Sequence, residues 1–249
     1  MAVAKELAPQ MCRSPVDASP GALRMMFRKM WNWGHRHTGQ RDRHVLAGEL
    51  LAGPDIRAIA GKLKAMPAQK IAVIGHSFTM EVNWASPSAF VPIASDMLRR
   101  TNPAIEVRQW QAGGLNPSRA DCRQFYREAL AWKPDRVLLV LASKGPRDLA
   151  ALDEMVGTFS KNGAKVMMFD TLGENNAAVG TDTQTVRGLS ARYGMAVIEI
   201  GPLLVSSPQR DSFVCLDGIH MTEPYHRLMA KEWLKYLAGA REAEQHAGK

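Results

Sequence analysis

From Lys70 onward, short apolar runs rich in β-branched residues alternate with longer stretches that repeat apolar residues at helical spacing. This alternation is typical of βαβ units, in which a helix connects each strand to a parallel neighbour. Most of the strand candidates are unbroken apolar runs, as expected for strands that helices cover on both faces. The predicted strands span residues 71–75, 105–110, 136–141, 165–169 and 195–200. We therefore expect an α/β domain with a mainly parallel sheet of five strands.

The helical stretches lie between these strands and after the last one. They span residues 88–100, 117–132, 148–162, 182–193 and 222–237. The final stretch has the clearest signals, with Thr222 at the N-cap position and Pro224 in the first turn. Gly163 and Gly194 follow helical stretches and precede strands, where a residue in the left-handed conformation ends a helix. These signals predict helices that pack on the sheet.

Residues 1–66 have a different character and carry most of the net charge. They hold eleven Lys and Arg against five Asp and Glu, which is +6 of the chain's +8. From Leu23 to Trp31, apolar side chains recur at helical spacing among basic residues, as in an amphipathic helix. Such a helix either packs on the main domain or a second protomer, or attaches to an anionic membrane surface or an acidic partner. We favour packing, and divide the chain into a basic, partly helical N-terminal extension (1–66), an α/β domain (67–240) and a C-terminal tail (241–249).

Composition and charge argue against several classes of protein. The 183 residues after residue 66 carry a net charge of only +2, whereas nucleic-acid-binding proteins spread positive charge over the folded body. No apolar stretch approaches the roughly 20 residues that a helix needs to cross a bilayer. The N-terminus also lacks the contiguous apolar segment of a secretory signal. We therefore expect a cytoplasmic protein that does not bind nucleic acid.

The cysteines and the clustered histidines do not predict a metal site. Cys12, Cys122 and Cys215 contain no C-x-x-C pair and no metal-ligand spacing, so we expect neither a disulfide framework nor a zinc site. The three histidines between residues 35 and 44 lack acidic or cysteine partners at ligand spacing. Reduced thiols, no metal and no organic cofactor are therefore the expectation.

The first candidate for chemistry is a serine that follows the first predicted strand. Ser77 stands just past the end of that strand and two residues after Gly75, which permits a tight turn. In open parallel sheets, ligands bind in the crevice beyond the carboxyl ends of the strands. Ser77 is therefore a candidate nucleophile, and the alternative is that it only caps the helix that follows.

The second candidate segment lies just before the final helix and contains Asp217 and His220. A serine hydroxyl is a weak nucleophile until an imidazole removes its proton, and the imidazole needs a carboxylate that orients it and stabilises the imidazolium. On one turn, Asp217 can accept a hydrogen bond from Nδ1 of His220, which leaves Nε2 to face Ser77. The alternative is an aspartate that caps a turn beside a surface histidine.

Together, the two segments resemble the SGNH, or GDSL-type, hydrolase superfamily over roughly residues 68–240. The string Gly-His-Ser-Phe-Thr resembles the first block of the family, with His76 where an aspartate is usual. The string Asp-Gly-Ile-His matches the last block. The resemblance implies a flavodoxin-like three-layer α/β/α sandwich. It also implies that Ser77 is the nucleophile, His220 the general base and acid, and Asp217 the orienting carboxylate.

Two middle blocks of this family supply oxyanion donors: a glycine after the second strand and an asparagine after the third. The resemblance therefore implies that a backbone N–H of Gly113 or Gly114 serves beside that of Ser77. Lys144 stands at the place of the asparagine, and loss of one oxyanion donor typically lowers kcat by about 10²–10³. Lys144 either donates from its ammonium instead or, like Arg147, holds an anionic group of the substrate.

These residues predict a serine hydrolase that removes an acetyl or other short acyl group from a small-molecule or glycan ester through an acyl-enzyme. The alternative is a catalytically impaired domain of this fold that serves as a binding or scaffolding module, suggested by Lys144 and by the basic extension. The nucleophile elbow of α/β-hydrolases, Gly-x-Ser-x-Gly, fits less well because Thr79 occupies its fifth position.

Overall fold

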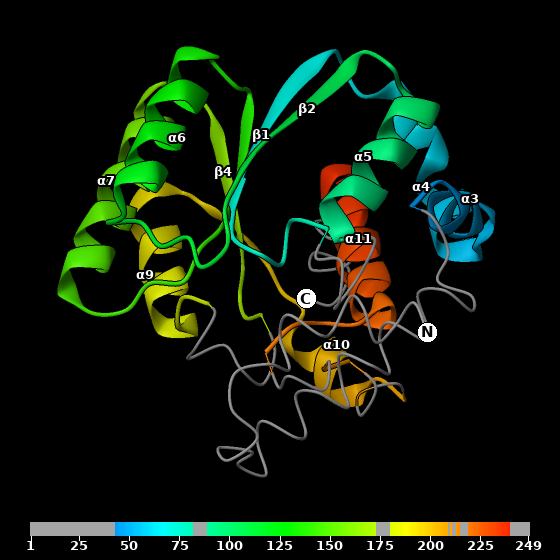
Figure 1. Ribbon diagram of the computed structural model, residues 1–249. Helices are drawn as coiled ribbons and strands as arrows, with labels where there is room; N and C mark the ends of the chain where they lie inside the picture. The colour runs from blue at the N-terminus through cyan, green and yellow to red at the C-terminus, as the bar shows by residue number, and fades with distance from the viewer. Residues whose placement is uncertain are drawn as a thin grey trace, which may run out of the picture.

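The computed structural model describes residues 43–81, 89–172, 180–208, 210, 213–214 and 219–239. A parallel sheet runs through the centre of this part of the chain, with the strand order β2-β1-β3-β4-β5 (Figure 1). Its strands are β1 (Gln69–Gly75), β2 (Ile105–Gln111), β3 (Arg136–Val140), β4 (Lys165–Phe169) and β5 (Ala196–Ile198). This is the flavodoxin-like order. The prediction of a mainly parallel five-stranded sheet is confirmed.

Helices cover both faces of the sheet and complete three layers (Figure 1). One side carries α3 (Arg43–Ala52), α4 (Pro54–Ala65), α5 (Phe90–Thr101) and α11 (Glu223–Leu237). The other side carries α6 (Ala120–Ala131), α7 (Pro146–Lys161) and α9 (Thr183–Tyr193). A short helix, α10 (Gly201–Ser206), follows β5 beyond the carboxyl end of that strand. Gly163 and Gly194 have φ angles of 84° and 65°, so both adopt the left-handed conformation expected after a helix.

The clearest difference from the sequence-based prediction is at the fifth strand, which ends at Ile198 and not at residue 200. Asp170, at the end of β4, explains this early end. Its Oδ1 atom accepts hydrogen bonds from the backbone N–H groups of Ile200 at 2.8 Å and Gly201 at 3.3 Å. These bonds turn the chain out of the sheet and into α10, a helix that the sequence pattern did not predict.

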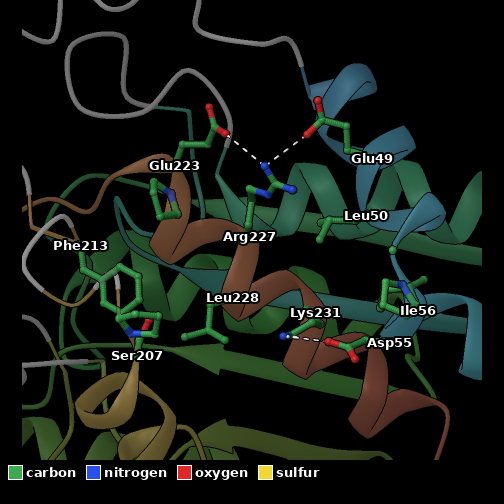
Figure 2. Close-up of a pocket in the computed structure, with 14 residues that line it drawn as sticks. Glu49, Leu50, Asp55, Ile56, Ser207, Phe213, Glu223, Arg227, Leu228 and Lys231 are labelled. Atoms are coloured by element: carbon green, nitrogen blue, oxygen red, sulfur yellow. Dashed lines mark hydrogen bonds and ion pairs between the residues drawn. The ribbon is translucent and has the colours of Figure 1, made fainter.

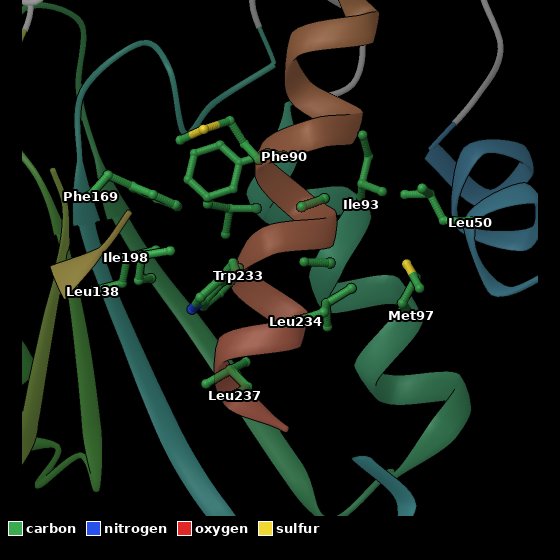
Figure 3. Close-up of a cluster of buried hydrophobic side chains, with 14 of the residues drawn as sticks. Leu50, Phe90, Ile93, Met97, Leu138, Phe169, Ile198, Trp233, Leu234 and Leu237 are labelled. Carbon is green, nitrogen blue, oxygen red and sulfur yellow. The ribbon is translucent and has the colours of Figure 1, made fainter. Parts of the chain in front are cut away.

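Two apolar clusters hold the layers together, one on each face of the sheet. On the α5 and α11 side, the ring of Phe90 lies 5.6 Å from that of Phe169 and 6.0 Å from that of Trp233, both edge to face (Figure 3). On the opposite side, the rings of Tyr126 of α6 and Phe159 of α7 pack edge to face, with centroids 5.4 Å apart. Each of these aromatic contacts joins two elements, so the layers are fixed relative to one another.

Helices α3 and α4 come from the segment assigned to the N-terminal extension, and they pack against α5 and α11. Their apolar side chains, Leu46 and Leu63 among them, belong to the same buried cluster as the α5 side chains. The Asn102 side chain strengthens this junction by donating to the backbone oxygens of Leu63 at 3.1 Å and Met66 at 2.9 Å. The amphipathic stretch between residues 23 and 31 lies outside the described residues, and the domain limits stay a prediction.

None of the helices in the described ranges is long and apolar enough to span a bilayer.

His226 of α11 is an ionisable residue that lies in the hydrophobic core, and its side chain is only 3% exposed. Its ring stacks on Phe90 with centroids 6.5 Å apart and meets Tyr225 edge to face at 5.5 Å. Burial and, to a lesser extent, the neighbouring His220 together lower the pKa of His226 from its ordinary value of 6.5 to about 3. The imidazole is therefore neutral in the folded protein at neutral pH.

We expect this burial to make the protein less stable in mild acid. Below pH 6.5 the unfolded chain protonates His226 while the folded chain does not, so protons favour unfolding. The free energy of unfolding should fall by roughly 2 kcal/mol from this group between pH 7 and pH 5. Urea unfolding at both pH values measures this loss. A His226→Phe variant should lack it, and equal pH dependence in the two proteins would contradict the assignment.

Candidate active site

The turn after β1 requires a glycine at its start. A Cβ atom on Gly75 would lie 2.4 Å from Cγ2 and 2.7 Å from Oγ1 of Thr79, closer than non-bonded atoms approach. Thr79 is buried and cannot withdraw, because its N–H and its hydroxyl both donate to the His76 carbonyl, at 2.9 and 2.8 Å. The chain is thus drawn into a tight turn, with Ser77 directly past the carboxyl end of β1.

His76 lies beneath this turn and is 2% exposed. The ring atom Nδ1 of His76 accepts a hydrogen bond from the backbone N–H of Phe78 at 3.3 Å. The backbone N–H of His76 donates to the Val140 carbonyl at 3.1 Å. Because Nδ1 accepts, the proton of the neutral ring is on Nε2. His76 therefore holds the turn that carries Ser77. Ser77 itself is half-buried, and among the described residues no hydrogen bond engages its hydroxyl.

His220 lies beside the same turn, although 143 positions separate it from Ser77 along the chain. The ring of Phe78, the residue after Ser77, is 6.3 Å from that of His220 and 6.1 Å from that of Tyr225. His220 precedes Met221, which pairs with Val214 in an isolated antiparallel bridge. The two segments singled out in the sequence therefore meet at one place in the fold.

Asp217 lies outside the described residues, so the predicted triad stays a prediction as a set.

The glycine block follows β2 and lies at the same edge of the sheet. The N–H of Ala112 donates to the Gly75 carbonyl at 3.3 Å, which joins this loop to the end of β1. Gly114 has a φ of +62°, a conformation that glycine adopts without strain. The carbonyls of Gly113 and Gly114 both accept from Nη1 of Arg119, each at 2.8 Å. Between described residues, no hydrogen bond uses the N–H of either glycine or that of Ser77.

Lys144 occupies the loop after β3, and its side chain is exposed. Its backbone N–H donates to Oδ2 of Asp148 at 2.9 Å, so it is not available to an oxyanion. Within the described ranges its ammonium forms no ion pair, which leaves the side chain as the group that can act on a substrate. Of the four predicted oxyanion positions, Lys144 thus differs from the other three, because only its side chain can donate.

Asp148 joins two of these loops and was not anticipated from the sequence. This carboxylate is 5% exposed, and its Oδ1 atom accepts from the N–H of Ser118 in the β2–α6 loop at 3.3 Å. Burial alone would raise its pKa, but the hydrogen bonds from Ser118 and Lys144 outweigh burial and lower the pKa. Asp148 therefore stays ionised and couples the position of the glycine loop to that of the Lys144 loop.

A polar pocket of about 520 Å³ lies elsewhere, between α3, α4 and the start of α11 (Figure 2). Its charges pair with one another: Arg227 lies 3.2 Å from Glu49 and 3.6 Å from Glu223, and Lys231 lies 3.1 Å from Asp55. None of the described residues predicted to act in catalysis lines this pocket. The candidate active site is therefore distinct from it.

The described residues contain no group of His, Cys, Asp and Glu side chains that is able to hold a metal ion. Cys122 is buried in the sheet-facing side of α6, and burial raises the pKa of its thiol to about 12. This thiol is protonated at neutral pH and is a poor nucleophile. Cys12 and Cys215 lie outside the described residues.

Comparison with solved structures gives several matches to one fold. The chain is similar to a lipase/acylhydrolase from Enterococcus faecalis, with 16% identity, a TM-score of 0.54, and coverage of 69% of this chain and 96% of that one. It is also similar to the acetylxylan esterase Axe2 from Geobacillus stearothermophilus, with 13% identity, a TM-score of 0.54, and coverage of 69% and 95%. The esterase EstA from Pseudoalteromonas sp. matches with 12% identity, a TM-score of 0.54, and coverage of 71% and 99%. No family model and no curated protein matches the chain.

These likenesses show that the chain has the fold of the SGNH hydrolases, in agreement with the resemblance found in the sequence.

The close approach of Gly75 and Thr79 generates a stability prediction. Replacement Gly75→Ala should destabilise the protein by about 1–3 kcal/mol, because the new methyl group overlaps a buried side chain that is itself hydrogen-bonded. Gly188→Ala is the matched control: a Cβ there meets no atom within 4 Å, and alanine favours the helix α9 by up to about 1 kcal/mol. Urea unfolding compares the two variants. A Gly75→Ala protein as stable as the native chain would contradict the geometry described above.

Proposed function

We propose that this protein is a serine hydrolase that cleaves carboxylic esters with short acyl groups. Ser77 is the nucleophile, His220 the general base and acid, and Asp217 the carboxylate that orients His220. The observation that carries this proposal is that His220 lies beside the turn that contains Ser77. The ring centroids of His220 and Phe78, the residue after Ser77, are 6.3 Å apart. Ser77 and His220 thus lie at the carboxyl end of the sheet, where open parallel sheets bind their ligands.

The proposed reaction is acyl transfer in two halves. His220 takes the hydroxyl proton of Ser77 as Oγ bonds to the ester carbonyl carbon, and the carbonyl oxygen becomes an oxyanion. The oxyanion then re-forms the carbonyl and expels the alcohol, which receives the proton from His220. Water attacks the acyl-enzyme with the same proton relay, releases the carboxylic acid and restores Ser77. Neither a metal ion nor an organic cofactor enters these steps.

The solved structures of similar fold support this choice of chemistry. Axe2 is an acetylxylan esterase, and two of its structures are catalytic mutants in which a serine or a histidine is replaced by alanine. The esterase EstA was solved in a form inhibited by monoethylphosphonate. By analogy, we propose an ester of a small molecule or a glycan as the substrate.

The nucleophile assignment predicts that Ser77→Ala abolishes hydrolysis of p-nitrophenyl acetate and removes covalent labelling by a fluorophosphonate probe. The physical reason is that only an activated hydroxyl reacts with the probe at neutral pH. Ser160→Ala is the control, because this serine lies near the end of α7, away from the crevice. Undiminished turnover by the Ser77→Ala variant would refute the assignment.

A second candidate function is a binding module that has lost catalysis, and Lys144 is the observation that favours it. The lysine replaces an oxyanion donor, and Asp148 already occupies its backbone N–H at 2.9 Å. Absence of fluorophosphonate labelling in the folded native protein would select this alternative over the hydrolase.

For the hydrolase, we expect the ammonium of Lys144 to supply the missing donor. Lys144→Ala should then lower kcat on p-nitrophenyl acetate by about 10²–10³ and leave KM nearly unchanged, because the interaction forms only in the transition state. Lys144→Asn should recover part of this loss through its amide N–H. Lys161→Ala, at the far end of α7, is the charge-matched control. Equal kcat values for Lys144→Ala and the native protein would show that the ammonium does not act on the oxyanion.

A further inference from the structure

We infer that Arg119 is a positioning residue for the oxyanion hole. Its guanidinium holds the glycine turn after β2 in the one orientation that aims two backbone N–H groups, those of Gly114 and Leu115, into the crevice. The inference rests on the proposed hydrolase function and deepens it, because it specifies the donors and the side chain that sets them.

The first step is the geometry of the peptide groups. In a trans peptide the C=O and the following N–H point in opposite directions. The carbonyls of Gly113 and Gly114 both point at Nη1 of Arg119, at 2.8 Å each. The N–H of Gly114 and that of Leu115 therefore both point away from the guanidinium.

The second step is the side of the turn on which the guanidinium lies. The Arg119 side chain is 40% exposed, so the guanidinium lies on the solvent side of the turn, and the two N–H groups point away from it. The N–H of Ala112, just before the turn, bonds to the Gly75 carbonyl at the base of the Ser77 turn. The glycine turn is therefore tied at its start to the end of β1.

The third step is the state of the two donors. Within the described part of the chain, no acceptor takes the N–H of Gly114 or of Leu115. Successive N–H groups without an acceptor, next to a residue with positive φ, are typical of sites that bind an anionic oxygen, and Gly114 has a φ of +62°. A developing oxyanion on an ester bound to Ser77 is such an oxygen.

The fourth step is the rigidity of the arginine. Nε and Nη2 of Arg119 bond to the two carboxylate oxygens of Asp121, at 3.1 and 2.6 Å, in a bidentate pair. Asp121 also accepts from the N–H of Cys122 at 2.9 Å, which anchors it to the first turn of α6. The Nε and Nη2 atoms of the guanidinium therefore bind Asp121 in α6, and Nη1 binds the carbonyls of the glycine turn. A lysine ammonium is a compact donor that cannot satisfy both sets of acceptors.

The experiment compares Arg119→Ala and Arg119→Lys with Arg123→Ala in the full chain. Arg123 is the matched control, because it lies one helical turn further along on α6 and pairs with Glu154 of α7 at 3.0 Å, and between described residues no hydrogen bond or ion pair joins its side chain to the glycine turn. Both Arg119 variants should lower kcat on p-nitrophenyl acetate by about 10-fold to 100-fold, with KM within about twofold of the native value. Arg123→Ala should change neither, and urea midpoints should stay alike, because both arginines are substantially exposed.

A second readout does not depend on turnover. Backbone ¹⁵N relaxation of the native protein should give order parameters near 0.85 for Gly113 and Gly114, and Arg119→Ala should lower them towards 0.6. If the native protein hydrolyses no ester and takes no probe, the proposed function fails and these order parameters alone decide the arginine's role. Native-like kcat in an active Arg119→Ala enzyme, or unchanged glycine order parameters, would overturn the inference.

Discussion

The structure depends most on the central place of β1, which lies between β2 and β3 in the sheet. The ladder continues past the strand ends: His76 donates to the Val140 carbonyl at 3.1 Å, and Ala112 donates to the Gly75 carbonyl at 3.3 Å. The loops after all three strands are therefore anchored to one another by main-chain bonds. Backbone geometry therefore places the proposed nucleophile, the glycine turn and Lys144, which are distant in sequence, at the carboxyl ends of neighbouring strands.

Much of this architecture could be predicted because parallel strands buried on both faces leave unbroken apolar runs, and because helix ends carry local signals such as Gly163, Gly194 and Thr222. The predicted run 165–169 coincides with β4. The early end of the fifth strand and helix α10 were missed, since both depend on the carboxylate of Asp170, 30 positions earlier than Ile200. Periodicity reports the burial of side chains and is silent about such a distant bond to the main chain.

The same limit explains which site residues escaped the sequence. Ser77 and His220 belong to short strings with a recognisable spacing, so they could be named in advance. The side chains of Arg119 and Asp148 form hydrogen bonds with main-chain atoms of loops, and the residues that flank them in the sequence do not indicate those partners. The only local hints are an arginine five positions after a paired glycine and an acid in the first turn of a helix. Both hints are common on exposed helix starts, so neither is specific.

Helices α3 and α4 pack on α5 and α11, and this packing limits where the protein can be truncated. Leu50 of α3 lies beside Ile93 of α5 (Figure 3), and Asn102 ties the end of α4 to the end of α5 through the backbone oxygens of Leu63 and Met66. A protein that lacks residues 1–66 would expose the apolar surfaces of α5 and α11 that α3 and α4 cover. We expect such a protein to self-associate. We therefore expect truncation at the boundary that the charge distribution suggests to destabilise the α/β domain.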